Sequence, residues 1–323
     1  MPPVALPKIA STAWEHPADR AALNTLRALP GFDEIVRRIA SYFGERGLRH
    51  LFLSDAVRCG PTQHPRLHAM IGELCATLDL MPVPELYVTQ SPVINAGAIG
   101  FERPFIVLNS ATLQQLGEDE QRIVLAHELG HILSGHMTYR TIAVIVSTVG
   151  LSALPFLAGV ALLPFQLALL EWRRKSELSC DRAALLAVQD PTVALRTFFR
   201  LAGGSTVPGE GDLDAFLQQA AEYEATSGAW DTVLKVLNTA LREHPFHTVR
   251  AAELQRWIQS GAYARIVGGE YPRRDAAGQQ AGAYADDVRA AADYYAGQAR
   301  QTVGKVADSF ARAADAFRRR AQS

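Results

Sequence analysis

The chain has 323 residues, of which 48% are hydrophobic and 20% are charged, and its formal net charge is -1. This composition is that of a globular protein and excludes a disordered chain. Because the chain has almost no net charge and no clustered basic surface, we exclude nucleic acid as a partner.

The cysteines and the first residues indicate the compartment. The cysteines are Cys59, Cys75 and Cys180. They are odd in number, far apart and outside any CxxC spacing, so they predict neither a disulfide framework nor a cysteine-based zinc site. The N-terminal segment lacks the basic and apolar regions of a secretory signal. We therefore expect the chain to begin in the cytoplasm.

Residues 18–78 predict an N-terminal helical layer, because apolar residues such as Leu23, Leu26 and Leu29 recur at helical spacing. From Pro84 onward, short β-branched stretches are bounded by Pro, Gly and Asn, which predicts a small sheet. A helix follows this sheet. The expected fold class is therefore α+β and mainly helical, with the sheet packed on that helix.

This helix carries the HExxH sequence that begins at His127 and ends at His131. Two histidines at i and i+4 lie on one face of a helix, where both imidazoles can reach one tetrahedral metal ion. Glu128 is placed to take a proton from metal-bound water and to pass it to the leaving amine. The motif also occurs by chance, so its context has to decide.

A catalytic zinc ion needs a third protein ligand and an open coordination position. Glu177 meets this need from a later helical stretch. Asp181 follows one helical turn further on and can accept a hydrogen bond from the non-ligating nitrogen of a zinc-bound histidine. The simpler explanation is that both carboxylates pair with neighbouring arginines on the surface. Together with HExxH we favour the ligand interpretation, which predicts one zinc ion per chain.

Residues 141–170 contain no charged side chain and are long enough for a membrane span. A single crossing is excluded, because the residues assigned to the metal lie on both sides of the segment. Two passes of about 15 residues would each cover roughly 22 Å, which is short of the roughly 30 Å hydrocarbon core. Two alternatives stay open. One is a shallow membrane hairpin flanked by Arg140 and Arg173, and the other is a buried helical pair.

We expect the whole chain to divide into three parts. Residues 1–263 form one catalytic domain, with the apolar segment inserted between the metal-ligand helices. Residues 264–283 are rich in Gly, Ala and Arg and predict a linker. Residues 284–323 predict an amphipathic helix, because apolar residues recur every three or four positions. Docking on the core, pairing with another chain and lying on a membrane surface stay open for this helix.

The stretches HELGHILSGH, SELSCDRAA and HPFHTVR, with the long apolar segment between the first two, resemble the M48 peptidase family, which contains HtpX and the CAAX prenyl proteases. The resemblance covers roughly residues 65–255. It implies a mixed α/β metallopeptidase core and an edge strand that binds substrate as an added β-strand. The residues of this strand are Asn95, Ala96, Gly97 and Ala98. The simpler explanation for them is an edge strand with a glycine bulge.

The same resemblance places His244 and Arg250 in the family's HP…R pattern. It implies that they stabilise the oxyanion, or that His244 takes the fourth zinc position. The alternative is a helix start that His244 caps, with Arg250 paired to a carboxylate. We expect His136, which lies off the ligand face, to be structural, and Cys180 to be a packed thiol.

The favoured function is a zinc-dependent metalloendopeptidase that cleaves polypeptide substrates in the cytoplasm, with membrane association on the cytoplasmic face left open. Misfolded or membrane-associated proteins are the expected substrates, which implies a role in protein quality control. The alternative is a scaffolding protein with a structural zinc ion, and the intact Glu128 argues against it. CAAX processing would need an enclosing set of membrane helices, which the sequence does not contain.

Overall fold

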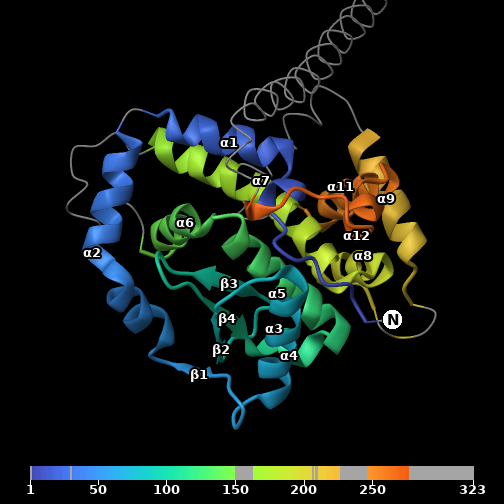
Figure 1. Ribbon diagram of the computed structural model, residues 1–323, viewed down its shortest axis with the longest axis horizontal. Helices are drawn as coiled ribbons and strands as arrows, with labels where there is room; N and C mark the ends of the chain where they lie inside the picture. The colour runs from blue at the N-terminus through green and yellow to red at the C-terminus, as the bar shows by residue number, and fades with distance from the viewer. Residues whose placement is uncertain are drawn as a thin grey trace, which may run out of the picture.

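The computed structural model describes residues 2–29, 31–149, 163–205, 207, 210–225 and 246–275. Helices dominate and a small sheet lies among them, which confirms the expected α+β class (Figure 1). The α-helices are α1 (Pro17–Arg27), α2 (Phe32–Leu53), α3 (Pro65–Leu78), α4 (Ser110–Gln115), α5 (Glu118–Leu133), α6 (Met137–Val149), α7 (Leu163–Val188), α8 (Pro191–Leu201), α9 (Leu213–Ala225), α11 (His247–Gln259) and α12 (Ala262–Val267).

Four strands form one mixed sheet in the order β1-β2-β4-β3. The parallel pair β2 and β4 lies in the centre, and β1 and β3 each pair antiparallel on the outside. Within the described residues β3 is therefore an edge strand, as the family resemblance implied. The strands are β1 (Ala56–Arg58), β2 (Glu85–Thr89), β3 (Ala96–Ile99) and β4 (Phe105–Asn109).

The two faces of the sheet pack against different helices. Leu86 and Ile106 are buried in the cluster that contains the apolar residues of α3 and α5. Tyr87 and Phe105 point to the other face, toward the end of α2, with their ring centroids 6.0 Å apart. This alternation follows from the pleat of a strand, in which successive side chains leave opposite faces. The sheet therefore rests on the HExxH helix, as expected.

Helices α5 and α7 approach each other closely at Gly130. A Cβ atom at Gly130 would lie 2.8 Å from the Cβ of Ala183 and 3.2 Å from the Cα of Cys180. Only glycine fits this crossing, because any side chain would push the two helices apart. The glycine inside the HExxH sequence thus lets α7 bring its own polar residues next to the two histidines.

The described parts of the apolar segment 141–170 lie in α6 and α7 and pack against the N-terminal helices. Ile142, Ile145 and Leu169 are buried in a second apolar cluster with residues of α1 and α2. For these residues the packing agrees with the buried helical pair. Residues 150–162, which include the expected turn of the hairpin, lie outside the described residues. Within the described part of the chain, no helix is both long and apolar enough to cross a membrane.

The chain after α11 folds back onto the N-terminal segment. Residues 264–267, which we expected in a linker, instead complete α12. The amide of Ala10 then donates to the carbonyl of Pro272 at 2.9 Å, and the amide of Arg274 donates to the carbonyl of Lys8 at 2.8 Å. These backbone hydrogen bonds fix residues up to 275 on the core. The predicted helix at 284–323 lies outside the described residues, so the division into domains stays a prediction.

Candidate metal centre

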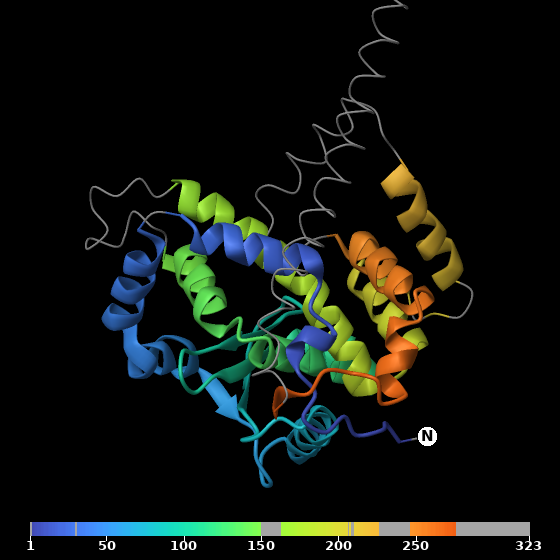
Figure 2. The same cartoon turned by 45° about the horizontal axis from the view of Figure 1, so that its top comes forward.

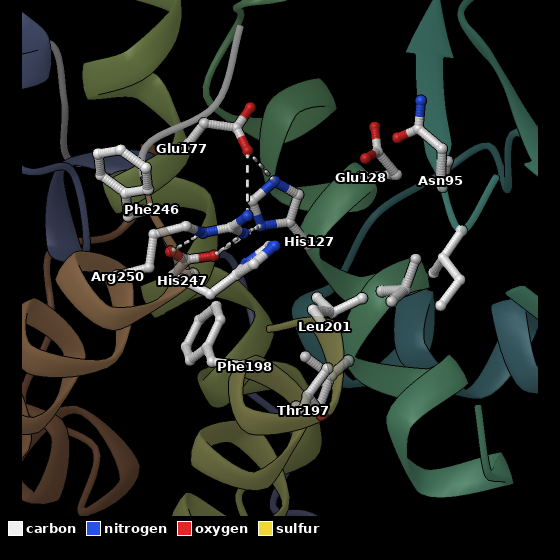
Figure 3. A pocket seen from close by; sticks show the side chains of 15 residues that line it. Asn95, His127, Glu128, Glu177, Thr197, Phe198, Leu201, Phe246, His247 and Arg250 are labelled. Atoms are coloured by element: carbon white, nitrogen blue, oxygen red, sulfur yellow. Dashed lines mark hydrogen bonds and ion pairs between the residues drawn. The ribbon is translucent and has the colours of Figure 1, made fainter. Parts of the chain in front are cut away.

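Three buried donor residues, His127, His131 and Glu177, converge where α5 meets α7. Figure 3 shows two of them, His127 and Glu177. Nε2 of His127 lies 3.2 Å from Oε2 of Glu177, and Nε2 of His131 lies 3.4 Å from Oε1 of Glu177. One donor atom of each residue lies within 4.8 Å of the others. Two imidazole nitrogens and one carboxylate from a later helix form the donor set of a catalytic zinc site, so these residues fit zinc.

Asp181 and Arg250 both contact Nδ1 of His127. Nδ1 of His127 lies 2.9 Å from Oδ1 of Asp181. Nε of Arg250 donates to Oδ2 of Asp181 at 2.9 Å, and Nη2 donates to Oδ1 at 2.5 Å. Burial would raise the pKa of Asp181, but the Arg250 guanidinium and His127 together outweigh burial and lower this pKa. The ionised Asp181 carboxylate therefore accepts the Nδ1–H of His127 and orients Nε2 toward Glu177.

Burial and charge act differently on the two histidines. Burial would lower the pKa of His127, but the carboxylates of Glu177 and Asp181 outweigh burial and raise this pKa to about 9. Burial, together with the positive charge of Arg140, holds the pKa of His131 well below its usual range. A metal ion binds neutral imidazole, so it must replace a proton on His127 but not on His131.

Glu128 connects the metal-ligand helix to the edge strand. Its Oε2 accepts a hydrogen bond of 2.7 Å from the amide of Ala98 in β3. The same oxygen accepts a second hydrogen bond of 3.0 Å from Nη2 of Arg140. The carboxylate is buried yet lines the cavity in front of His127. It is thereby fixed between the metal ligands and the backbone of β3, where a base can act on water in the cavity.

Arg140 is a buried part of this site, whereas one of the two alternatives for residues 141–170 made it a basic flank of a membrane hairpin. The side chain is 2% exposed, and its Nη1 lies 2.6 Å from Nε2 of His131 and 3.2 Å from Oε1 of Glu177. A metal ion bound to Nε2 of His131 would sit about 2.0–2.1 Å from that nitrogen. The guanidinium and a metal ion therefore compete for the same nitrogen lone pair.

A cavity of about 390 Å³ opens in front of the donors. Apolar side chains of α5 and α8 form one wall of it, and the beginning of β3 forms the opposite rim (Figure 3). The residues that line the cavity are Ile94, Asn95, Ala96, Ile123, Val124, His127, Glu128, Glu177, Asp181, Thr197, Phe198, Leu201, Phe246, His247 and Arg250.

The structure brings most of the sequence-predicted residues together. Asn95 and Ala96 line the cavity, whereas Gly97 and Ala98 follow in β3 and do not line it, although the amide of Ala98 contacts Glu128. His244 lies outside the described residues. Arg250 pairs with a carboxylate, as one of the two alternatives had it. The catalytic and substrate-binding roles of these residues stay predictions.

Sequence reasoning missed two residues of the site. Arg140 gave no signal, because a basic residue beside an apolar stretch is also typical of a membrane flank. His247 lies within the HPFHTVR stretch, and its side chain lines the cavity beside His127 and Arg250 (Figure 3). Cys180 is a buried free thiol, as expected. His136 is buried as well, and it contacts His131.

An HExxH helix with a third carboxylate from a later helix, placed beside a cavity and a strand edge, defines a metallopeptidase. The sequence profile of peptidase family M48 matches residues 61–258, which is more than half of the chain. The chain therefore belongs to peptidase family M48, and it is a metal-dependent hydrolase that acts on polypeptides.

Known proteins agree with this family. Plastoglobule-localized metallopeptidase 48, chloroplastic, from Arabidopsis thaliana is 33% identical over 271 residues, which cover 83% of this chain and 78% of that protein. Protease HtpX homolog 2 from Methanosarcina mazei is 25% identical over 235 residues, which cover 65% of this chain and 78% of that protein. A protease HtpX homolog from Moorella thermoacetica is 31% identical over 120 residues, which cover 36% of this chain and 39% of that protein. No solved structure matches the chain significantly.

Proposed function

We propose that the chain is a zinc-dependent endopeptidase in which His127, His131 and Glu177 bind one zinc ion. The observation that carries this proposal is the convergence of the three donors beside Glu128 and an open cavity. When bound there, zinc supplies a Lewis acid that polarises the peptide carbonyl and lowers the pKa of water. A structural site has no need of a base next to its ligands, so the position of Glu128 favours catalysis over scaffolding.

Glu128 is the proposed general base and then the general acid. Its carboxylate takes a proton from the attacking water and passes this proton to the nitrogen of the leaving amine. The hydrogen bonds from Ala98 and Arg140 hold the carboxylate at the rim of the cavity. A fixed carboxylate loses less orientational freedom when the transition state forms.

Strand β3 is the proposed binding site for the substrate backbone. Within the described sheet β3 has a neighbour on one side only, so an extended peptide can add to its other edge. Asn95 and Ala96 line the cavity at the start of this strand, and Gly97 and Ala98 lead on from there to Glu128. A peptide along β3 would therefore pass its backbone in front of the base.

Two residues of α11, Arg250 and His247, are proposed to stabilise the oxyanion that forms when water adds to the peptide carbonyl. Nε and Nη2 of Arg250 both donate to Asp181, Nη1 lies 3.6 Å from Oε2 of Glu177, and the residue lines the cavity. His247 lines the cavity next to it. We extend the role first assigned to His244 and Arg250 to include His247, because an imidazole there can donate to the developing negative charge.

For the biological setting we propose a cytoplasmic peptidase of protein quality control. Two relatives are proteases named after HtpX, and the cavity wall is apolar, as suits a peptidase that cleaves exposed apolar segments of unfolded chains. Contact with a membrane surface through 141–170 or through the C-terminal helix belongs to the same proposal.

Casein hydrolysis tests the proposed function directly. We expect the purified chain to cleave casein, to lose this activity with 1,10-phenanthroline and to regain it when zinc is added back. The variant Glu128→Gln should also lose this activity, and Glu118→Gln serves as its matched control, because Glu118 is an exposed glutamate on the same helix. Cleavage that survives removal of the metal would overturn the proposal.

A further inference from the structure

A chain of buried polar contacts leads from His131 away from the cavity and ends on α1. Nδ1 of His131 lies 3.3 Å from Nδ1 of His136, and Nε2 of His136 lies 3.1 Å from Oδ2 of Asp19. All three side chains are at most 2% exposed. Asp19 lies before the residues that the family profile matches, because this match begins at residue 61.

The end of α5 explains how His136 reaches His131. The helix stops at Leu133, and Gly135 follows with a φ of +67°, a left-handed conformation that glycine adopts readily. The amide of His136 then donates to the carbonyl of His131 at 3.1 Å. Since His136 is no longer part of α5, the helical geometry that would point its side chain away from the ligand face does not apply.

The protons along this chain of contacts can be assigned from Arg140. A guanidinium only donates, so the Nη1 of Arg140 at 2.6 Å requires a lone pair on Nε2 of His131. The proton of the neutral His131 imidazole is then on Nδ1, and it is donated to Nδ1 of His136. The proton of His136 is in turn on Nε2, and Asp19 accepts it. A metal ion at Nε2 of His131 needs the same tautomer.

Asp19 and His136 are themselves held in place from several sides. Ser179 donates its hydroxyl proton to Oδ2 of Asp19 at 2.5 Å, and the amide of His16 donates to the hydroxyl oxygen of Ser179 at 2.9 Å. The ring of His136 meets the ring of Trp172 edge-on, with centroids 5.5 Å apart. Figure 2 shows α1, which carries Asp19, lying along α7, which carries Ser179 and Trp172.

The other histidine ligand, His127, is also held by a carboxylate, but through a direct contact. Nδ1 of His127 meets the carboxylate of Asp181 without an intermediate. For His131 the intermediate is an imidazole, and the carboxylate comes from a helix far away in the sequence. Removing such a hydrogen-bond partner of a ligating histidine typically weakens metal binding about 10- to 100-fold.

We propose that Asp19 and His136 are positioning residues that fix the tautomer and ring orientation of His131. Helix α1, which carries Asp19, therefore contributes to zinc binding. This inference rests on the proposed zinc site. The contacts of His136 also admit a different arrangement. His131, His136 and Cys180 lie close enough to hold a metal ion of their own, and a count of bound zinc separates the two.

The test measures the zinc affinity of the full chain by competition with a chromophoric chelator. We expect Asp19→Ala and His136→Leu each to weaken zinc binding about 10- to 100-fold. The double variant should lose no more zinc affinity than the single variant with the larger loss, since both residues act through one chain of contacts. The visible spectrum of the cobalt-loaded protein should shift in both variants, because the orientation of His131 changes.

Two further variants separate positioning from folding. Leu26→Ala removes a fully buried side chain of α1 that takes no part in these contacts, so it should lower the melting temperature and leave zinc affinity unchanged. Asp19→Asn keeps the size and one acceptor oxygen, so it should recover part of the zinc affinity that Asp19→Ala loses. It also replaces Asp19→Ala if that variant fails to fold.

The inference is overturned if folded Asp19→Asn and His136→Leu bind zinc as tightly as the wild type, or if Leu26→Ala weakens zinc binding as much as they do. Two zinc ions in the wild type, with one lost in His136→Leu, would also overturn it. A wild type that binds no zinc would instead overturn the proposed function.

Discussion

Replacing Arg250 with methionine tests a buried ion pair of the site. Arg250 is 7% exposed and forms two hydrogen bonds with Asp181, at 2.9 and 2.5 Å. Methionine fills a similar volume but leaves the Asp181 carboxylate buried without the guanidinium that forms two hydrogen bonds with it. Breaking a buried pair in this way costs about 3–5 kcal/mol, so we expect Arg250→Met to lose that much free energy of unfolding.

Urea denaturation at pH 7, with a chelator present throughout, measures this loss. The matched control is Arg256→Met, which removes an arginine of the same helix from a half-exposed ion pair with Glu253. Such surface pairs contribute about 0–1 kcal/mol. The double variant Asp181→Leu/Arg250→Met should be more stable than Arg250→Met alone, because it also removes the orphaned charge. A loss below about 1 kcal/mol in Arg250→Met, or a double variant that is less stable still, would refute the reasoning.

The remaining predictions concern zinc affinity, acid stability and specificity. Arg140→Gln should raise zinc affinity about tenfold or more in a chelator competition, because it removes the cation at His131, and weaker binding would contradict this. Burial would raise the pKa of Glu253, but the hydrogen bond with His16 outweighs burial and, with the nearby positive charges, lowers this pKa to about 2. The stability advantage of the wild type over Glu253→Gln, at most about 3 kcal/mol, should therefore be full above pH ~4.5 and vanish as the pH falls toward ~2 in urea titrations. Leu201→Ala should shift cleavage of a peptide library toward larger apolar side chains, and an unchanged pattern would contradict this.

Local sequence patterns were enough to predict the parts of the site that depend on helix geometry. The spacing of His127 and His131 places them on one face of a helix whatever surrounds it. The spacing of Glu177 and Asp181 does the same on α7. Short β-branched stretches between Pro, Gly and Asn predicted the sheet, because these residues favour extended backbone and turns. Its edge strand was implied only by the family resemblance.

Contacts between distant segments could not be predicted in this way. Arg140 lies beside a long apolar run, and it is buried next to the metal ligands only because α6 packs on α2 and α7. The contact of His136 with His131 was not predicted, because we placed His136 on a continuing helix, whereas Gly135 ends that helix just before it. Asp19 meets His136 only once α1 has docked along α7, and no periodic pattern in the sequence encodes that docking.

The most direct test of the account is casein hydrolysis by Glu128→Gln protein whose zinc content has been measured in the same sample. The substitution keeps the size of the side chain and leaves His127, His131 and Glu177 untouched. The account predicts one zinc ion per chain, as in the wild type, and a loss of at least about 100-fold in the rate of hydrolysis. Hydrolysis at the wild-type rate by this zinc-loaded variant would contradict the assignment of Glu128 as the base.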